Sequence, residues 1–307
     1  MEPVYLNSHK KGKLKEKIDR LYRILESCEI CPRKCRVNRL KGEKGYCKSG
    51  KDLMISSFNA HFGEEEPLVG SGGSGTIFLT NCNLLCIYCQ NYDISHLGYG
   101  NAVSEEKAAD YMIYLQEQGC HNINLVTPTH FTPQLVKAID FAMKKGLHLP
   151  IVWNCGGYES AEIIKFLEGI VDIYMPDMKY GSSDSAKKYS DAPDYTERCE
   201  EAVIEMHRQV GDLIIEDGIA KRGLLIRHLV LPNNEAGSEQ ILKFIAEKIS
   251  KNTYINIMDQ YRPAYKAHEY EKLRRRPNLK EYKAVVELAK KFGLERGETF
   301  RHCLRLW

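Results

Sequence analysis

Three thiols lie within one short stretch of the chain, at Cys82, Cys86 and Cys89, in the spacing CxxxCxxC. Iron–sulfur clusters usually take four thiolates, so three from one stretch fill three irons of a 4Fe-4S cube and leave the fourth iron open for a reactant. Two alternatives remain: a tetrahedral zinc site that a distant ligand completes, and three buried free cysteines. The spacing favours the cluster.

A short apolar run, residues 76–80, precedes these cysteines and predicts a strand, so the thiols are expected on the loop that leaves it. Strand-like runs recur along the chain, at residues 122–126, 149–154, 171–175, 224–231 and 254–258. Helical patterns separate them, one of which opens at Thr132 and ends near Gly146. This alternation predicts an α/β fold, a parallel sheet wrapped into a partial (β/α)6 barrel, whose reactive groups gather at the carboxyl ends of the strands.

An amphipathic helix is predicted over residues 13–27, because apolar side chains recur at three- and four-residue steps. We expect it to pack on the main domain. It runs into a second group of cysteines, at Cys28, Cys31, Cys35 and Cys47.

Four local thiolates suit a structural zinc ion and a second iron–sulfur cluster equally, because both bind soft sulfur in a tetrahedral arrangement. The alternative is four reduced cysteines in a surface knuckle. This segment has few apolar residues to hold it together unaided, which favours a metal.

The remaining segments divide the chain into three regions: residues 1–50 with the cysteine knuckle, residues 51–265 with the barrel, and a helical extension at 266–307. Residues 53–75 are interpreted as a linker that wraps into the barrel, and their glycine-rich end, 70–75, as a flexible lead-in to the first strand. A last helix is predicted at roughly residues 280–292.

The composition indicates which partners and which cellular compartment to expect. The net charge of +3 arises from 44 basic and 41 acidic residues, so no global field steers the chain onto nucleic acid. No apolar run approaches the roughly 20 residues that cross a bilayer, and the chain start lacks an apolar signal segment. Clustered rather than paired cysteines fit a reducing compartment. We therefore expect a cytoplasmic protein without a membrane partner.

The cysteine spacing, with the aromatic Tyr88 just before the third thiol, resembles the signature of the radical S-adenosylmethionine (SAM) superfamily. The segments 73–78, 89–95 and 172–177 resemble, more narrowly, its pyruvate formate-lyase activating enzyme-like branch and an uncharacterised iron–sulfur subgroup there. The resemblance covers nearly the whole chain. It implies a 4Fe-4S cluster whose open iron chelates SAM through its amino and carboxylate groups.

The same resemblance implies roles for charged residues at later strand ends. In activating enzymes of this class an Asp-x-Lys on the fourth strand contacts the cofactor ribose region, and an arginine on the fifth reaches the cofactor carboxylate; Asp177, Lys179 and Arg227 match these positions. Tyr88 joins this cofactor-binding set. The alternative for the charged residues is a structural ion pair at the edge of the barrel.

The second strand departs from the family pattern, because the usual Gly-Gly-Glu that binds the cofactor amino group is replaced by residues 127–130. Thr127 and Thr129 offer hydroxyl or carbonyl oxygens to an ammonium, and His130 offers an acceptor or a group that faces substrate. A helix-capping role is the alternative. Candidate adenine or substrate contacts, at the end of the sixth strand, are Asp259 and Gln260.

The resemblance implies an enzyme that reductively cleaves SAM and uses the resulting 5′-deoxyadenosyl radical to abstract hydrogen from a substrate, a protein if the chain is activase-like. It also implies a reductant such as flavodoxin or ferredoxin. Two alternatives are an RNA-modifying radical SAM enzyme, which the near-neutral charge disfavours, and a non-catalytic electron-transfer or metal-binding protein.

Overall fold

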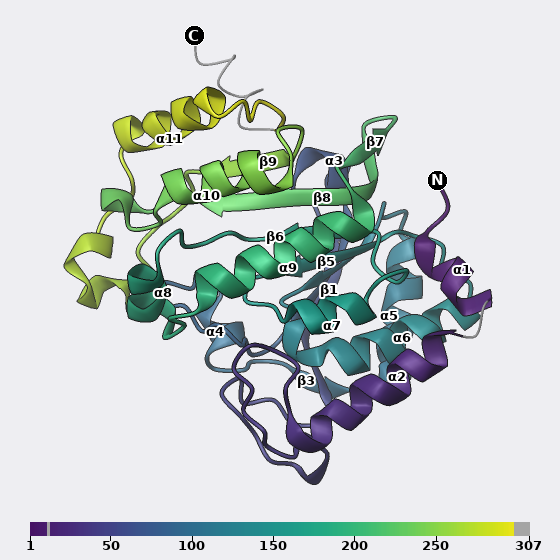
Figure 1. The fold of residues 1–307 in the computed structure, drawn as a ribbon. Helices are drawn as coiled ribbons and strands as arrows, with labels where there is room; N and C mark the ends of the chain where they lie inside the picture. The colour runs from purple at the N-terminus through teal and green to yellow at the C-terminus, as the bar shows by residue number, and fades with distance from the viewer. Residues whose placement is uncertain (11–12, 298–307) are drawn as a thin grey trace.

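The computed structural model describes residues 1–10 and 13–297 and is built around one sheet (Figure 1). Six neighbouring strands run parallel, which confirms the predicted fold class. In spatial order they are β2 (Ser74–Leu79), β4 (Ile123–Val126), β5 (Ile151–Cys155), β6 (Ile173–Pro176), β8 (Ile219–Leu229) and β9 (Tyr254–Met258). Within the described ranges β9 pairs with β8 and not with β2, so the barrel is partial.

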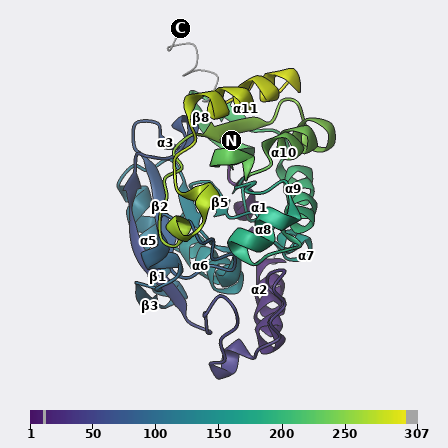
Figure 2. The ribbon, with the colours of Figure 1, turned by 90° about the vertical axis from the view of Figure 1, so that its left-hand side faces the viewer.

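Helices surround the outer face of this sheet (Figures 1 and 2). They are α5 (Glu105–Glu117), α6 (Thr132–Lys144), α7 (Ala161–Phe166), α8 (Ser183–Ser190), α9 (Tyr195–Val210) and α10 (Ser238–Phe244), which continues as a π-helical turn (Ile245–Ile249). Ser104 caps α5 by accepting a hydrogen bond from the Lys107 amide. The predicted helix that opens at Thr132 is confirmed.

The strands β5, β6, β8 and β9 contribute side chains to two cores, because successive residues point to opposite faces of a sheet. Trp153 packs into the outer core beneath the helices, whereas its neighbour Val152 belongs to an inner core with Met175 and Leu225. Leu68, from the short helix α3 (Glu66–Val69), completes this inner core. The barrel interior is therefore closed by a segment that precedes its first strand.

The interpretation of residues 53–75 as a linker is wrong. They form β1 (Leu53–His61), which pairs antiparallel with β2, and β3 (Asn101–Val103) pairs antiparallel with β1 on its other side. Buried Leu53 and Ile55 alternate with more exposed neighbours, the pattern of a half-buried strand.

The glycine-rich end of this segment is closely packed rather than a flexible lead-in. A Cβ on Gly75 would lie 2.5 Å from the Asn122 carbonyl oxygen, and one on Gly72 would lie 1.9 Å from that of Gly119. The glycines are therefore needed for close backbone approach beside β2.

The N-terminal region begins with α1 (Val4–Lys10) and α2 (Lys13–Ile24), which continues as a 3₁₀ turn (Leu25–Ser27). This confirms the predicted helix, and its buried Leu14 and Leu21 face the barrel, where α2 contacts α6. The loops of residues 28–52 contain one further 3₁₀ turn (Arg39–Lys41) and lie beside α4 (Tyr92–Ser95), the short helix after the first barrel strand (Figure 1).

The C-terminal helix α11 (Leu279–Lys291) confirms the last predicted helix, and Asn278 and Glu281 form a capping box at its start. Residues 298–307 of the predicted third region lie outside the described residues. Shorter elements complete the fold: β7 (Ile214–Glu216) and the 3₁₀ turns Thr129–Phe131, Pro232–Asn234, Ala267–Glu269 and Glu271–Leu273. Among the described residues, no helix is long and apolar enough to span a bilayer.

Candidate functional site

The loop that carries Cys82, Cys86 and Cys89 leaves the carboxyl end of β2, where a strand-end reactive group was predicted. Leu85 within it has a φ of +53°, which tightens the turn between the cysteines. We refer to residues 81–91 as the cluster loop.

Every sulfur of the cluster loop accepts a hydrogen bond. The Leu84 amide donates to Cys82 Sγ at 3.3 Å, the Ser190 hydroxyl to Cys86 Sγ at 3.1 Å, and the Ser95 hydroxyl to Cys89 Sγ at 3.2 Å. Such donors stabilise thiolate more than thiol, and hydrogen bonds to the sulfurs are one of the protein's means of tuning a cluster.

The surroundings of the three sulfurs fit a 4Fe-4S cluster. Burial, reinforced by the neighbouring Cys86, raises the pKa of Cys82 to about 12, so a bound cation is needed to hold it as thiolate at neutral pH. Across residues 1–10 and 13–297, no three His, Cys, Asp or Glu side chains converge on a single ion. A cubane takes each thiolate on a different iron, so its ligands need not converge in that way.

A half-buried charged network lies at the carboxyl ends of the neighbouring strands. Asp177, just after β6, accepts hydrogen bonds from Arg227 Nε of β8 at 2.7 Å and from Lys179 Nζ at 2.6 Å. Arg227 Nη2 also donates to Asn154 Oδ1 of β5 at 2.7 Å. Three residues predicted from three separate sequence positions are thus brought together.

The charges of this network reinforce one another. Burial by itself raises the pKa of Asp177, but the cations of Arg227 and Lys179 outweigh it and hold that pKa below its usual range. The Lys179 ammonium also lowers the pKa of Cys89 against the dominant effect of burial. The network therefore lies near enough to the cluster loop to act on it electrostatically.

Glu64 is a member of this network that the sequence analysis missed. It follows β1, and its carboxylate lies 3.5 Å from Arg227 Nη1. Burial raises the pKa of Glu64 to about 7, although Arg227 opposes that rise. Its neighbour Glu65 accepts a hydrogen bond from the Asn256 amide of β9 at 3.0 Å. The acidic triplet after an alternating apolar run was the available signal, and the linker interpretation concealed it.

The other residues predicted to contact the cofactor lie in different surroundings. Thr127, at the end of β4, has a φ of +60°, a strained conformation for a β-branched residue. Thr129 is buried and its hydroxyl donates to buried Glu159. Tyr88 is buried against Tyr180 and Tyr261 in edge-to-face contacts. Their cofactor contacts stay predictions.

Two predicted groups lie at the exposed edge of the site. Asp259 and Gln260 are exposed, and the Gln260 carbonyl accepts a hydrogen bond from Gln90 Nε2 of the cluster loop at 3.2 Å. The end of the sixth barrel strand therefore lies beside the first strand's loop across the opening of the partial barrel.

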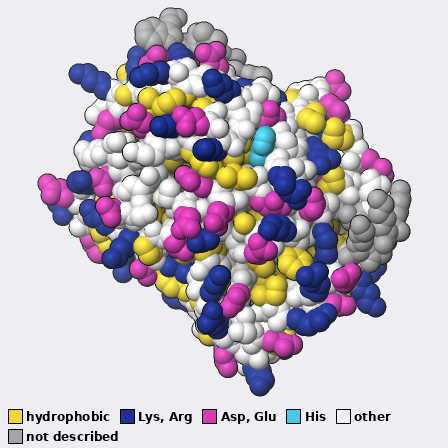
Figure 3. All heavy atoms as spheres, viewed as in Figure 1, with side chains coloured by type: hydrophobic (Ala, Val, Ile, Leu, Met, Phe, Trp, Pro, Cys, Tyr) yellow, Lys and Arg dark blue, Asp and Glu magenta, His cyan; other side chains and the backbone are white. Residues whose placement is uncertain are grey.

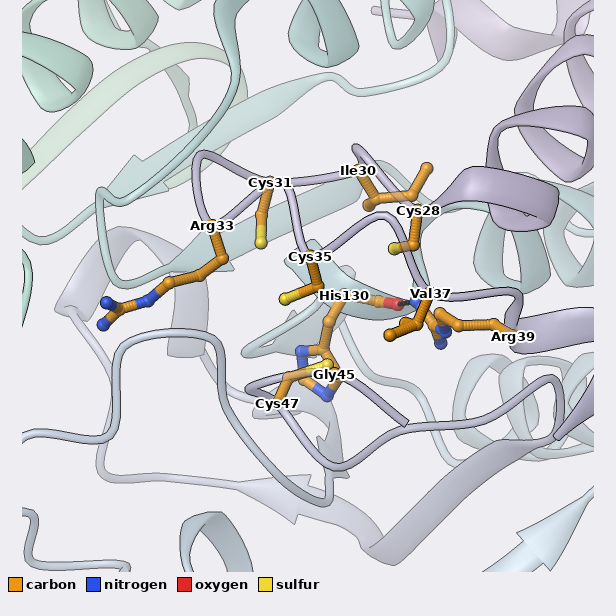
Figure 4. A pocket seen from close by; sticks show the side chains of 10 residues that line it. All are labelled: Cys28, Ile30, Cys31, Arg33, Cys35, Val37, Arg39, Gly45, Cys47 and His130. Carbon is orange, nitrogen blue, oxygen red and sulfur yellow. Dashed lines mark hydrogen bonds between the residues drawn. The ribbon is translucent and has the colours of Figure 1, made fainter. Parts of the chain in front are cut away.

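The four N-terminal cysteines line one small enclosed cavity of about 10 Å³, room for about one water-sized sphere (Figure 4). Gly45 turns the chain there, since a Cβ on it would lie 2.7 Å from Cys35 Sγ. Burial raises the pKa values of Cys31 and Cys47, and the neighbouring thiols raise that of Cys31 further. We refer to residues 28–47 as the knuckle; its metal stays a prediction.

The knuckle contacts the cluster loop directly. Arg33 donates to the carbonyl oxygens of Asn83 at 3.0 Å and Ser190 at 2.8 Å, and its guanidinium stacks 3.7 Å from the Tyr46 ring centroid. Lys48 donates to the His96 carbonyl at 3.4 Å. The two cysteine groups therefore lie on neighbouring loops.

His130 does not occupy the substrate-facing position that its place after the second strand suggested. It is 1% exposed, its Nε2 lies 2.8 Å from the Thr80 carbonyl oxygen, and it lines the cysteine cavity of the knuckle. His130 lies in the 3₁₀ turn over Thr129–Phe131, which brings its side chain to the knuckle's cavity. Burial lowers the pKa of His130 to about 3, so its ring is neutral.

Comparison with known proteins agrees with this geometry. A model of the radical SAM superfamily matches residues 76–245, more than half of the chain, from the first barrel strand to the end of α10. The chain belongs to the radical SAM superfamily. Membership implies a 4Fe-4S cluster and SAM as cofactors, which the cysteines of the cluster loop suit.

Other similarities are to proteins without an assigned substrate. This radical SAM protein is 32% identical over 288 residues to the uncharacterized protein MJ0674 of Methanocaldococcus jannaschii, covering 91% of this chain and 79% of that protein. It is 22% identical over 258 residues to the uncharacterized protein MJ0808 of the same organism, covering 78% and 71%.

Among solved structures, a radical SAM methyltransferase from Sphaerobacter thermophilus aligns with a TM-score of 0.49 and 13% identity. The alignment covers 72% of this chain and 64% of that one, so this chain spans less than two thirds of the methyltransferase's length.

Proposed function

We propose that this protein is a radical SAM enzyme that cleaves SAM reductively and abstracts a hydrogen atom from its substrate. Cys82, Cys86 and Cys89 would bind the 4Fe-4S cluster, which with SAM supplies an electron and a 5′-deoxyadenosyl radical. The observation that carries the proposal is the half-buried charged network beside the cluster loop, at the carboxyl ends of parallel strands.

The charged network is suited to the zwitterionic end of SAM and to its ribose. We assign Arg227 to the carboxylate and Asp177 with Lys179 to the ribose region. Asp177 now accepts a hydrogen bond from both cations, so a ligand carboxylate on Arg227 would exchange one charge-assisted hydrogen bond for another. Such an exchange avoids leaving a buried cation unpaired.

The cofactor ammonium needs an acceptor, because Gly-Gly-Glu is absent after the second strand. We assign this role to Glu64, whose carboxylate lies 3.5 Å from Arg227 and therefore next to the proposed carboxylate site. Thr127 is a second acceptor candidate, because its left-handed backbone sits at the end of β4.

The substrate class in this proposal is a protein, as in activating enzymes, because the motifs resemble that branch of the family. Figure 3 shows basic and acidic side chains interspersed over the visible face, which is a poor surface for RNA. A flavodoxin- or ferredoxin-like reductant would supply the electron. We further propose that the knuckle holds a second metal, zinc or an auxiliary cluster, and that the protein works in the reducing cytoplasm.

The test is anaerobic reconstitution with iron and sulfide, followed by SAM and dithionite, with chromatographic detection of products. Methionine and 5′-deoxyadenosine are expected in equal amounts, together with the absorption of a 4Fe-4S cluster. A cluster that reduces and reoxidises without cleaving SAM would instead identify a non-catalytic electron-transfer protein.

A further inference from the structure

His130 follows a barrel strand in the sequence, but in the structure its side chain lies beside the knuckle. It follows β4, yet with Cys28, Cys31, Cys35 and Cys47 it lines the same cavity (Figure 4). The five side chains come from segments about 80 to 100 residues apart in the chain, so no local motif reveals their meeting.

One nitrogen of the His130 ring, Nε2, forms a hydrogen bond, and the other, Nδ1, forms none within the described structure. A carbonyl oxygen only accepts, so Nε2, which lies 2.8 Å from the Thr80 carbonyl, must carry the proton. In the neutral ring Nδ1 then presents its lone pair. Nδ1 is buried and has no hydrogen-bond partner within the described structure. A buried acceptor without a partner is destabilising, so this nitrogen is suited to binding a ligand.

The backbone around His130 is fixed from the knuckle side. Arg39, which is 1% exposed, donates to the His130 carbonyl at 2.6 Å and twice to the Gly50 carbonyl, at 2.9 and 2.7 Å. Arg39 thus ties the backbone of the histidine to the knuckle loop.

We propose that His130 Nδ1 is a ligand of the knuckle's metal centre: Cys28, Cys31, Cys35, Cys47 and this barrel histidine supply five candidate donors, of which a tetrahedral metal or a cluster takes four. Metal-binding histidines almost always donate their other ring N–H to a carbonyl or carboxylate, which sets the tautomer and the ring orientation. The bond from Nε2 to Thr80 does this. A soft, thiolate-binding metal, zinc or the iron of a cluster, is the chemical class that such a donor set takes.

The assignment links the knuckle's metal to the cluster loop through one hydrogen bond. Thr80 lies two residues before Cys82, so a metal on Nδ1 would be joined through the imidazole and the Thr80 carbonyl to the start of that loop. Loading the knuckle would thereby hold the base of the cluster loop in place. This inference depends on the second metal proposed above but not on SAM cleavage.

The experiment compares the full-length protein with His130→Gln, in which the terminal amide can keep the bond to Thr80 but no group replaces Nδ1. The matched control is His228→Gln, because His228 is equally buried and both its nitrogens have partners, the Met178 carbonyl and the Ser238 hydroxyl, each at 2.8 Å. Iron and zinc are counted per chain after anaerobic reconstitution and during a chelator time course.

The wild type should contain about 4 iron plus about 1 zinc, or about 8 iron. In His130→Gln, the metal beyond the first 4 iron should leave about 10- to 100-fold faster, while His228→Gln follows the wild type. Equal time courses for His130→Gln and the wild type would overturn the proposal, as would a wild type with about 4 iron and no zinc. If His130→Gln does not fold, X-ray absorption spectroscopy of the second metal in the wild type replaces the comparison. A nitrogen ligand is then expected, and sulfur ligands alone would overturn the proposal. SAM cleavage is scored separately, so it can fail without affecting this result.

Discussion

The two cysteine groups lie on adjacent loops but differ in what surrounds their sulfurs. Beside the cluster loop are ionised side chains from two barrel strands, β6 and β8, which bond mainly to one another: Asp177, Lys179 and Arg227. Within the knuckle, Arg33 and Arg39 donate to backbone carbonyls, and the group with an unpartnered nitrogen is the neutral imidazole of His130. Ion pairs can be exchanged for a charged ligand, whereas backbone contacts cannot. This difference separates a centre suited to a reactant from one suited to a structural or electron-relaying metal.

The different roles of the two cysteine groups are tested most directly by removing one thiol from each. Cys86→Ala should lower 5′-deoxyadenosine formation to background, because a ligand to the reactive cluster is lost. Cys47→Ala should lose the second metal and leave the segment 1–50 open to proteolysis, yet still cleave SAM with dithionite as reductant. Product analysis, metal analysis and limited proteolysis measure these outcomes.

Cys120→Ala is the control for both thiol substitutions, since Cys120 is buried away from either group, beside Gly75. It should match the wild type in all three measurements. If Cys47→Ala abolished SAM cleavage and Cys86→Ala did not, the roles assigned to the two groups would have to be exchanged.

A second prediction tests the charged network against a similar carboxylate outside it. Asp177→Asn should weaken SAM binding by roughly 1–3 kcal/mol, about 5- to 150-fold, because it removes a charged hydrogen-bonding partner at the proposed ligand site. Asp172, whose carboxylate accepts from the backbone amides of Val4 and Ile151, provides the control. Asp172→Asn should change thermal stability without changing the affinity measured by calorimetric titration. Equal affinities in both variants and wild type would leave the network a structural one.

Much of this comparison was predictable from the sequence. The apolar runs predicted all six parallel strands, because a strand buried on both faces is continuously apolar. The order of those strands then brought together Asp177, Lys179 and Arg227, since the carboxyl ends of parallel strands share one edge.

Other features depend on contacts that no local pattern specifies. Glu64 was hidden because β1 was interpreted as linker, although its alternation was visible. His130 was placed by its order after the second strand, but a single 3₁₀ turn directs it to the knuckle. Ser190 donates to Cys86 from 104 residues away, which only the packing of α8 determines.

A third prediction concerns the pH dependence of Glu64. Burial raises the pKa of the Glu64 carboxyl to about 7. The protonated carboxyl therefore stabilises the folded state, fully at pH values below the ordinary pKa of glutamate and progressively less as the pH rises through 7. Glu64→Gln should therefore remove part of the fall in melting temperature between pH 5 and pH 8. SAM affinity should change in the opposite sense, because an ammonium needs the carboxylate: wild-type affinity should weaken by up to about tenfold per pH unit below 7.

The measurement is calorimetric titration and thermal unfolding of both proteins at several pH values. Glu64→Gln should bind SAM weakly at pH 8 and lack the wild-type increase in affinity between pH 6 and pH 8. An unchanged pH profile of affinity in the variant would assign the ammonium to Thr127 or another acceptor.

The smallest predicted effect tests whether hydrogen bonds to the sulfurs distinguish the cluster loop. Ser190 is 2% exposed. Its hydroxyl oxygen lies 2.7 Å from the Tyr180 hydroxyl and 3.1 Å from Cys86 Sγ, to which it donates. A donor to a cluster thiolate favours the reduced, more negative state, so Ser190→Ala should lower the midpoint potential of the cluster.

Ser74→Ala is the matched control, because Ser74 is equally buried at the opposite end of β2 and donates to Asn122 at 2.7 Å. Potentiometric titration followed by electron paramagnetic resonance should show a lower potential in Ser190→Ala and the wild-type value in Ser74→Ala. A rise in Ser190→Ala, or equal shifts in both, would mean that the Ser190 hydroxyl positions the loop of α8 rather than the charge on Cys86.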